Sequence, residues 1–314
     1  MNTPNSLTRI VRAKALELGF SKVGVARFGT MKTEGARLGE WLARGYQGTM
    51  EWMAKNSDKR ADVCQILPNA KSIISLALNY YTPTEHSRSP EIGKISRYAW
   101  GDDYHILMTA RIQSLADCII SSEPGVNAKF YVDTGPVMDK AWAVRAGVGW
   151  LGKHTNVITK EFGSWVFLGE IILDAELEYD EPMVDFCGTC TACIEACPTQ
   201  AIVDPYVLDS TKCISYLTIE HKGEIPDLLK SKFENWVYGC DICQDVCPWN
   251  RFQQPTNERS FSPRAENVDP RIEELERITP EEFTQRFKRS PIKRTKREGL
   301  IRNARAAREG RNHR

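Results

Sequence analysis

The apolar positions at the start of the chain change from the period of a helix to that of a strand. In residues 7–18 they recur every three or four residues, and Ser6, just before them, is a residue type that caps helices. In residues 21–28, Val23 and Val25 alternate with small or polar residues, as in a strand with one buried face. The chain is therefore expected to begin with a helix followed by a strand.

Helical and strand-like segments continue to alternate up to about residue 178. The expected strands are residues 72–78, 129–132 and 165–173, and the expected helices are residues 104–120 and 137–146. Such alternation predicts an α/β domain over residues 1–178. The longest apolar runs have the length of strands and are too short to cross a membrane, so we expect no membrane-spanning segment.

Two further regions follow this domain. Residues 179–255 are rich in cysteine and proline, which leaves little room for long helices or strands and predicts a small cluster-binding domain. Residues 256–314 begin with a proline-containing linker, continue with helical segments over residues 272–288 and end in a basic tail.

Charge is distributed unevenly along the chain. There are 42 Lys or Arg against 41 Asp or Glu, yet residues 288–314 hold eleven Lys or Arg and only two Glu. This excess predicts contact with a polyanion, and the alternative is a flexible, solvated tail. The composition, with 41% hydrophobic and 26% charged residues, excludes a mainly disordered chain.

The cysteines give the most specific signal. The N-terminal residues lack the apolar block of a secretory signal, so we expect a reducing, cytoplasmic setting in which crowded cysteines bind metal. Residues 187–198 have the spacing C-x₂-C-x₂-C-x₃-C-P of bacterial two-cluster ferredoxins. Residues 240–248 supply C-x₂-C-x₃-C-P, and Cys213 can provide the ligand that this second motif lacks.

In two-cluster ferredoxins the last cysteine of each motif binds the other cluster. This rule assigns Cys187, Cys190, Cys193 and Cys247 to one [4Fe–4S] cluster, and Cys197, Cys213, Cys240 and Cys243 to the other. The alternative is a pair of Cys₄ zinc sites, which the same thiolates would satisfy. Cys64 and Cys118, outside the motifs, are expected to be ordinary buried residues.

Residues 1–178 are more than an electron carrier needs, which favours a catalytic domain that consumes the electrons. Gly147, Gly149 and Gly152 match G-x-G-x-x-G, but they follow a helical segment rather than a strand, so dinucleotide binding is disfavoured. A plain glycine turn, or a loop that lets the backbone approach a large flat ligand, remain open. Asp133, at the end of a strand, is either a turn residue or an acid that faces a ligand.

Cobalamin is one such large flat ligand. One mode of binding it uses a histidine in the motif D-x-H-x-x-G, and no histidine of this chain has that spacing. Asp103-Tyr-His105 lacks the glycine, and His221 is wrongly spaced from Gly223.

Several segments together resemble the epoxyqueuosine reductase family, whose members use cobalamin and iron–sulfur clusters in the last step of queuosine synthesis in tRNA. These segments are residues 97–105, 132–136, 145–153, 187–198, 213–223 and 238–248. The resemblance implies a nitroreductase-like domain that binds cobalamin without a protein histidine on cobalt. We expect a monomer as the default oligomeric state, and an external low-potential donor as the source of electrons.

The resemblance further implies roles for individual residues. Asp133 would donate a proton to the epoxide oxygen, with a raised pKa, and tRNA would present the modified base from its anticodon loop. The residues expected to contact cobalamin are Arg60, Asp133, Val157, Leu168 and Ser215, the Val and Leu through their backbones. The family's C-terminal region usually continues into HEAT-like helices, whereas this chain ends soon after residues 290–294, which leaves its tRNA-docking surface open.

Two rival functions share part of this pattern. A reductive dehalogenase would also combine cobalamin with two clusters, but the basic tail and the lack of an export signal disfavour it. An electron-carrier protein would hold the clusters and no corrinoid.

Overall fold

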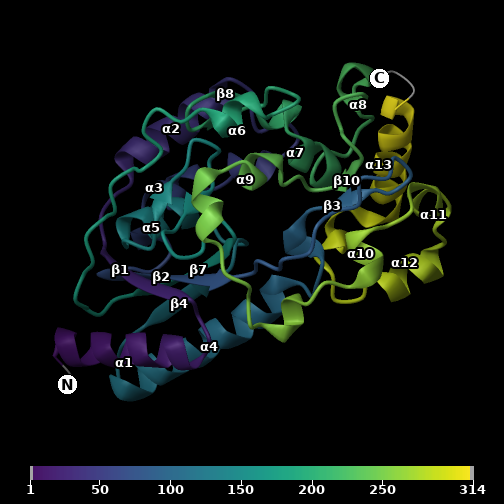
Figure 1. The fold of residues 1–314 in the computed structure, drawn as a ribbon. Coiled ribbons are helices and arrows are strands. Elements are labelled where there is room, and N and C mark those ends of the chain that lie inside the picture. The colour runs from purple at the N-terminus through teal and green to yellow at the C-terminus, as the bar shows by residue number, and fades with distance from the viewer. Residues whose placement is uncertain (1–2, 312–314) are drawn as a thin grey trace.

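The computed structural model describes residues 3–311 and is built around a four-stranded sheet (Figure 1). Its strands are β1 (Lys22–Arg27), β2 (Ser72–Asn79), β7 (Val166–Leu173) and β4 (Ala128–Tyr131), in the order β1-β2-β7-β4. Every pairing is antiparallel. The predicted strands are confirmed, and because the sheet is antiparallel the mixed helix and strand arrangement is α+β. The alternation of elements carries no information on the direction in which each strand enters the sheet.

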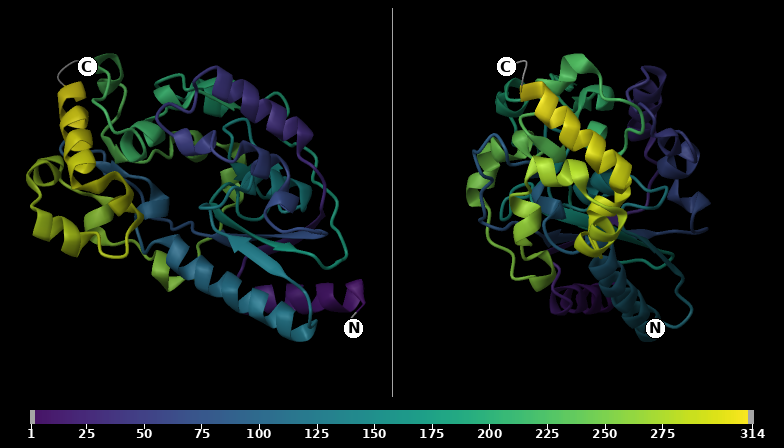
Figure 2. Two further views of the ribbon diagram at one scale, coloured as in Figure 1. Left: turned by 180° about the vertical axis from the view of Figure 1, so that it is seen from behind. Right: turned by 90° about the vertical axis from the view of Figure 1, so that its right-hand side faces the viewer.

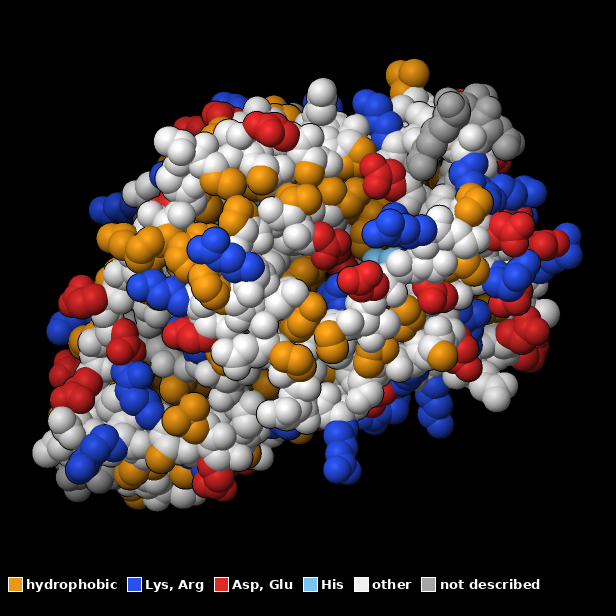
Figure 3. Space-filling model, viewed as in Figure 1, with side chains coloured by type: hydrophobic (Ala, Val, Ile, Leu, Met, Phe, Trp, Pro, Cys, Tyr) orange, Lys and Arg blue, Asp and Glu red, His pale blue; other side chains and the backbone are white. Residues whose placement is uncertain are grey.

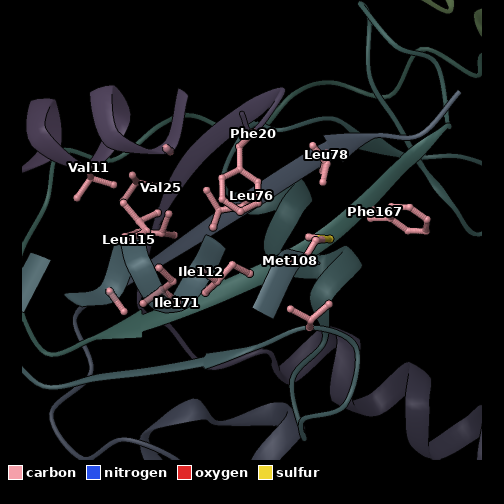
Figure 4. Close-up of a cluster of buried hydrophobic side chains, with 14 of the residues drawn as sticks. Val11, Phe20, Val25, Leu76, Leu78, Met108, Ile112, Leu115, Phe167 and Ile171 are labelled. Atoms are coloured by element: carbon pink, nitrogen blue, oxygen red, sulfur yellow. The ribbon is translucent and has the colours of Figure 1, made fainter. Parts of the chain in front are cut away.

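Helices cover both faces of the sheet (Figure 2). On one face, α1 (Pro4–Glu17) and α4 (Tyr104–Ser122) bury a cluster that includes Val11, Leu76, Ile112 and Ile171 (Figure 4). On the other face, α5 (Asp139–Arg145) buries Trp142 against the sheet, and α2 (Lys32–Ala43) and α3 (Ser57–Ala61) lie outside it. Because both faces are covered, all eight residues of β2 are buried.

The first helix starts earlier than its apolar pattern indicated. Thr3, not Ser6, is the N-cap, and its side chain accepts a hydrogen bond from the backbone N–H of Ser6 at 3.2 Å. Pro4 takes the first helical position, where its missing N–H costs nothing.

The remaining strands form three two-stranded ribbons. They pair β5 (Trp150–Leu151) with β6 (Val157–Ile158), β3 (Lys94–Ile95) with β10 (Trp236–Tyr238), and β8 (Ile202–Asp204) with β9 (Val207–Leu208). The cysteine-rich region holds only short helices: α6 (Ala192–Glu195), α7 (Ile214–Ile219), α8 (Asp227–Lys230) and α9 (Ile242–Asp245). This matches the expectation from its prolines. No helix within residues 3–311 has the length and apolarity needed to cross a membrane.

The C-terminal helices are α10 (Ala265–Val268), α11 (Ile272–Arg277), α12 (Pro280–Arg286) and α13 (Lys296–Arg311). They share a core with residues outside 256–314, because Trp100 and Val237 pack in the same cluster as Leu275, Phe287 and Leu300. The flexible-tail alternative is therefore wrong up to Arg311, and residues 312–314 lie outside the described part. On the face seen in Figure 3, basic and acidic side chains are interspersed and no single continuous basic patch is visible.

We expect Leu300→Ala to lower the free energy of unfolding by about 2–5 kcal/mol, because Leu300 is fully buried and the substitution leaves a cavity. Chemical denaturation of the intact protein under anaerobic conditions measures this. Arg305→Ala, on the exposed side of the same helix, is the control and should change the value by less than about 0.5 kcal/mol. Equal effects of the two substitutions would contradict the packed position of α13.

Candidate active site

A cavity of about 1380 Å³ lies where the sheet meets the cysteine-rich region. Its volume exceeds the roughly 300–1,000 Å³ of a typical ligand pocket. The wall includes residues of the loop between β4 and α5, the start of α4, the end of β7 nearest Val166, and α7. Residues that lie far apart in the sequence therefore meet around one space that can hold a large ligand.

Asp133 lies in the wall of this cavity, in the loop that follows β4, with a left-handed backbone φ of 61°. The Tyr104 hydroxyl donates a hydrogen bond to Asp133 Oδ2 at 2.6 Å, and His105 Nε2 lies 3.8 Å from the same oxygen. The Asp133 side chain is 58% exposed. The structure therefore places Asp133 in a loop at the cavity surface, and its role as an acid that faces a ligand stays a prediction.

Tyr104 was not identified from the sequence. Burial, together with the Asp133 carboxylate, raises the pKa of Tyr104 far above its ordinary value, so the phenol remains a hydrogen-bond donor. Its ring stacks on Phe167 of β7, with centroids 4.2 Å apart and planes 7° apart. The sequence feature that could have identified Tyr104 is its position next to Asp103, the residue that caps α4.

Arg60, on α3, is 8% exposed and contacts the backbone of the loop that contains Asp133. Its Nη1 donates to the carbonyl oxygens of Gly135 at 3.4 Å and Val137 at 3.3 Å. Burial lowers the pKa of Arg60, although Asp139 and Asp133 oppose this. The structure therefore gives Arg60 a contact with the loop as well as a position in the cavity wall.

The other residues expected to contact a corrin are not all at the cavity. Leu168 of β7 and Ser215 of α7 line it. Val157 of β6 is 3% exposed and packs in the core cluster beneath the sheet, and its neighbour Asn156 reaches the wall instead. The structure thus brings together Arg60, Asp133, Leu168 and Ser215, and leaves the side chain of Val157 outside.

The glycine-rich loop does not line the cavity. A Cβ on Gly149 would lie 2.2 Å from the carbonyl oxygen of Ile158, so this glycine allows β5 and β6 to approach each other. Of the interpretations left open, the glycine turn is confirmed, and the close approach to a flat ligand is wrong because the partner is the chain's own backbone.

The eight motif cysteines differ in their position relative to the cavity, and their assignment to two clusters stays a prediction. All four of the second set line the cavity: Cys197, Cys213, Cys240 and Cys243. In the first set, Cys193 interacts electrostatically with Cys247, Cys187 and Cys190, and Cys190 is exposed at the surface. The cavity wall therefore borders one set directly, while the other set lies farther from it.

A half-buried and a fully buried carboxyl group form a pair beside the cavity. Asp139, the first residue of α5, lines the wall, and Glu170 on β7 is fully buried and accepts a long hydrogen bond from Ser75 at 3.5 Å. Burial, then the charge of Asp133, raises the pKa of Asp139 to about 7. Burial and Asp139 raise the pKa of Glu170 well above its ordinary range, so the pair holds a proton at neutral pH.

This pair predicts a loss of stability as the pH rises. The unfolded chain releases the Asp139 proton near 3.8, but the folded chain releases it only near 7, so the free energy of unfolding falls across this window. Glu170→Gln removes one of the two charges and should flatten that fall. Anaerobic thermal unfolding from pH 4 to 8 measures it. His86 and His154 titrate in both proteins, so the difference between the wild-type and Glu170→Gln stability curves reports the carboxyl pair. Parallel curves for the two proteins would contradict the prediction.

Two family models match the chain. Residues 60–134 match "Epoxyqueuosine reductase QueG, DUF1730", and residues 186–250 match a "4Fe-4S double cluster binding domain". The second match supports the iron–sulfur interpretation of the cysteines over the zinc alternative.

Curated relatives and solved structures agree with these models. The epoxyqueuosine reductase of Cellulophaga algicola is 46% identical over 303 residues, which cover 96% of this chain and 98% of the relative. An epoxyqueuosine reductase crystallised with an epoxyqueuosine-modified tRNA-Tyr stem loop is 34% identical, with a TM-score of 0.91 over 97% of this chain and 81% of that one. A Bacillus subtilis epoxyqueuosine reductase, with its catalytic aspartate loop swung out of the active site, is 32% identical, with a TM-score of 0.90 over 97% of this chain and 82% of that one. The chain therefore belongs to the epoxyqueuosine reductase family.

Proposed function

We propose that this protein reduces epoxyqueuosine to queuosine at the wobble position of the tRNA anticodon. The observation that carries the proposal is the cavity, which has Asp133 in one wall and four cluster cysteines in another. The structural relative that matches 97% of this chain was solved with an epoxyqueuosine-modified tRNA stem loop. The reaction removes the epoxide oxygen as water and requires two electrons and two protons.

The cavity fits cobalamin as the group between the clusters and the substrate. Its size exceeds that of an ordinary ligand pocket, and Arg60, Leu168 and Ser215 would contact the cofactor from three different elements. Reduced cobalamin supplies a strong nucleophile for opening an epoxide. We extend the proposal to a nitroreductase-like sheet domain and to a backbone contact from Val157.

The two cysteine sets indicate the order of electron transfer. We place the entry point at the cluster of Cys187, Cys190, Cys193 and Cys247, because Cys190 is exposed where a low-potential donor can approach. The second cluster borders the cavity and would pass the electrons on.

The residues of the chain then have distinct tasks in the reaction. Asp133 donates a proton to the opening oxygen as a general acid. Tyr104 holds the Asp133 carboxyl through its 2.6 Å hydrogen bond, and Arg60 holds the loop through two carbonyl oxygens. The Bacillus relative, which has a catalytic aspartate loop, supports this role for Asp133.

The tRNA is expected to approach the open side of the cavity. Lys293 and Arg294, in the segment before α13, lie in the cavity wall, and Arg294 pairs with Glu220 at 3.0 Å. A wobble base is single-stranded and can be extended into a pocket. Within α13, however, Arg302 donates to the carbonyl oxygens of Leu217 and His221, so part of the basic tail has a structural task.

An anaerobic turnover assay tests the function. Epoxyqueuosine-containing tRNA is incubated with the protein and a low-potential reductant, with and without cobalamin, and nucleosides are read by mass spectrometry. Cobalamin-dependent queuosine is the expected result, from a cytoplasmic, monomeric enzyme. No product despite intact clusters and bound corrinoid would point to another substrate, as in a dehalogenase. No bound corrinoid would favour an electron carrier.

A further inference from the structure

We propose that His105, oriented by Asp103, is a proton relay that returns a proton to Asp133 during turnover. This inference deepens the proposed function and depends on it. It starts from the stoichiometry of the reaction. Removing the epoxide oxygen as water breaks two C–O bonds, forms one C=C bond, consumes two electrons from the clusters and adds two protons to one oxygen. Asp133 carries one proton at a time, so another group must supply the second proton.

His105 is fixed in a definite orientation at the start of α4. Asp103 is the N-cap, and its carboxylate accepts from the backbone N–H of His105 at 3.0 Å and pairs with His105 Nδ1 at 2.8 Å. The ring of His105 also stacks on Tyr104, with centroids 4.1 Å apart. Tyr104 stacks in turn on Phe167 of the sheet. The imidazole is therefore held on both its edge and its face.

This orientation determines which ring nitrogen of His105 faces Asp133. Burial alone would raise the pKa of Asp103, but hydrogen bonds from His105 keep it below its ordinary value, so Asp103 is a carboxylate that accepts from Nδ1–H. The other nitrogen, Nε2, lies 3.8 Å from Asp133 Oδ2. That separation is too long for a direct hydrogen bond, but one water or a small movement of the loop closes it. Catalytic hydrogen bonds are often this long before substrate binds.

Two carboxylates lie beside His105. Its two ion-pair partners are Asp103, from its own helix cap, and Asp133, from the loop after β4. Arg294, which also lines the cavity, interacts electrostatically with Asp133. When the tRNA base and cofactor fill the cavity, they displace bulk water from Asp133. The imidazolium Nε2–H then remains as the nearby proton source, and Asp103 stabilises its charge.

The test compares His105→Gln, Asp103→Asn and the control His221→Gln in single-turnover reactions of the pre-reduced holoenzyme from pH 5.5 to 9. We expect the wild-type rate to fall at basic pH, where proton return to Asp133 is lost. His105→Gln should be slower by about 10²-fold and lose this basic limb. Asp103→Asn keeps a residue that caps helices and should move the limb to lower pH. His221, which pairs with the Glu224 carbonyl outside the cavity wall, should behave as wild type.

Two binding measurements separate a relay from a structural role. Cobalamin affinity by visible absorption and tRNA affinity by filter binding should stay within about twofold of wild type in His105→Gln, since the relay acts after binding. A His105→Gln protein with the wild-type rate and basic limb would overturn the proposal. So would a parallel loss of affinity and rate. If wild type itself forms no queuosine, the proposed function fails before any variant is compared.

Discussion

Asp133→Asn is expected to lower the rate of queuosine formation by about 10²–10⁴-fold, the range for loss of a general acid. The amide occupies the same space and can still accept from the Tyr104 hydroxyl, which lies 2.6 Å from the native carboxylate. It cannot transfer a proton to the epoxide oxygen. The loop geometry should also persist, because Arg60 holds it through backbone carbonyl oxygens of Gly135 and Val137 rather than through the Asp133 side chain.

The measurement is nucleoside mass spectrometry after anaerobic single turnover, with cobalamin binding followed by absorption. Asp174→Asn is a matched control, since Asp174 is a second turn aspartate that bonds Asn127 away from the cavity wall. An Asp133→Asn enzyme with the wild-type rate would reject the assignment. A variant that no longer binds cobalamin would assign Asp133 to cofactor binding instead of proton transfer.

Cys213→Ala is expected to remove one cluster of the two and to abolish turnover that depends on the external electron donor. Cys213 lies outside the compact motifs, yet it borders the cavity together with Cys197, Cys240 and Cys243. Loss of this ligand should therefore interrupt the electron path at its last step. Iron and acid-labile sulfide should fall to about half of the wild-type content, because each cubane holds the same number of both.

Cys118→Ala is the matched control, because Cys118 lies on α4 outside both motifs and should leave the metal content unchanged. Cys187→Ala extends the test to the other set, where the cluster nearer the surface should be lost instead. If the Cys213→Ala protein kept both clusters and its activity, the crossing assignment of the ligands would be wrong.

The correct sequence predictions and the failed ones differ in the distance over which the signal acts. The helix at residues 104–120 and the strands at 72–78 and 165–173 follow from periods of a few residues, and the structure has them within one or two residues. The glycine loop shows the opposite case. Its spacing suggested a ligand, but the neighbour of Gly149 is the Ile158 backbone, which depends on how the chain turns back on itself.

The basic tail illustrates the same limit. Its charge is plain in the sequence, but the sequence pattern did not show that Leu300 and Ala304 would pack with Trp100 and Val237. Buried apolar positions in a short, arginine-rich segment can be recognised as a core only when their partners are known. Part of the charge therefore stabilises the fold.

By itself the sequence predicted the cluster ligands and determined the main helices and strands and the family, because each of these depends on residue types at short, fixed spacings. Only the tertiary structure decided the antiparallel order of the sheet, the pairing of Asp139 with Glu170, and the meeting of Tyr104 and His105 with Asp133. These contacts join residues on different elements. Their energies come from packing and burial in the folded molecule, about which local periodicity contains no information.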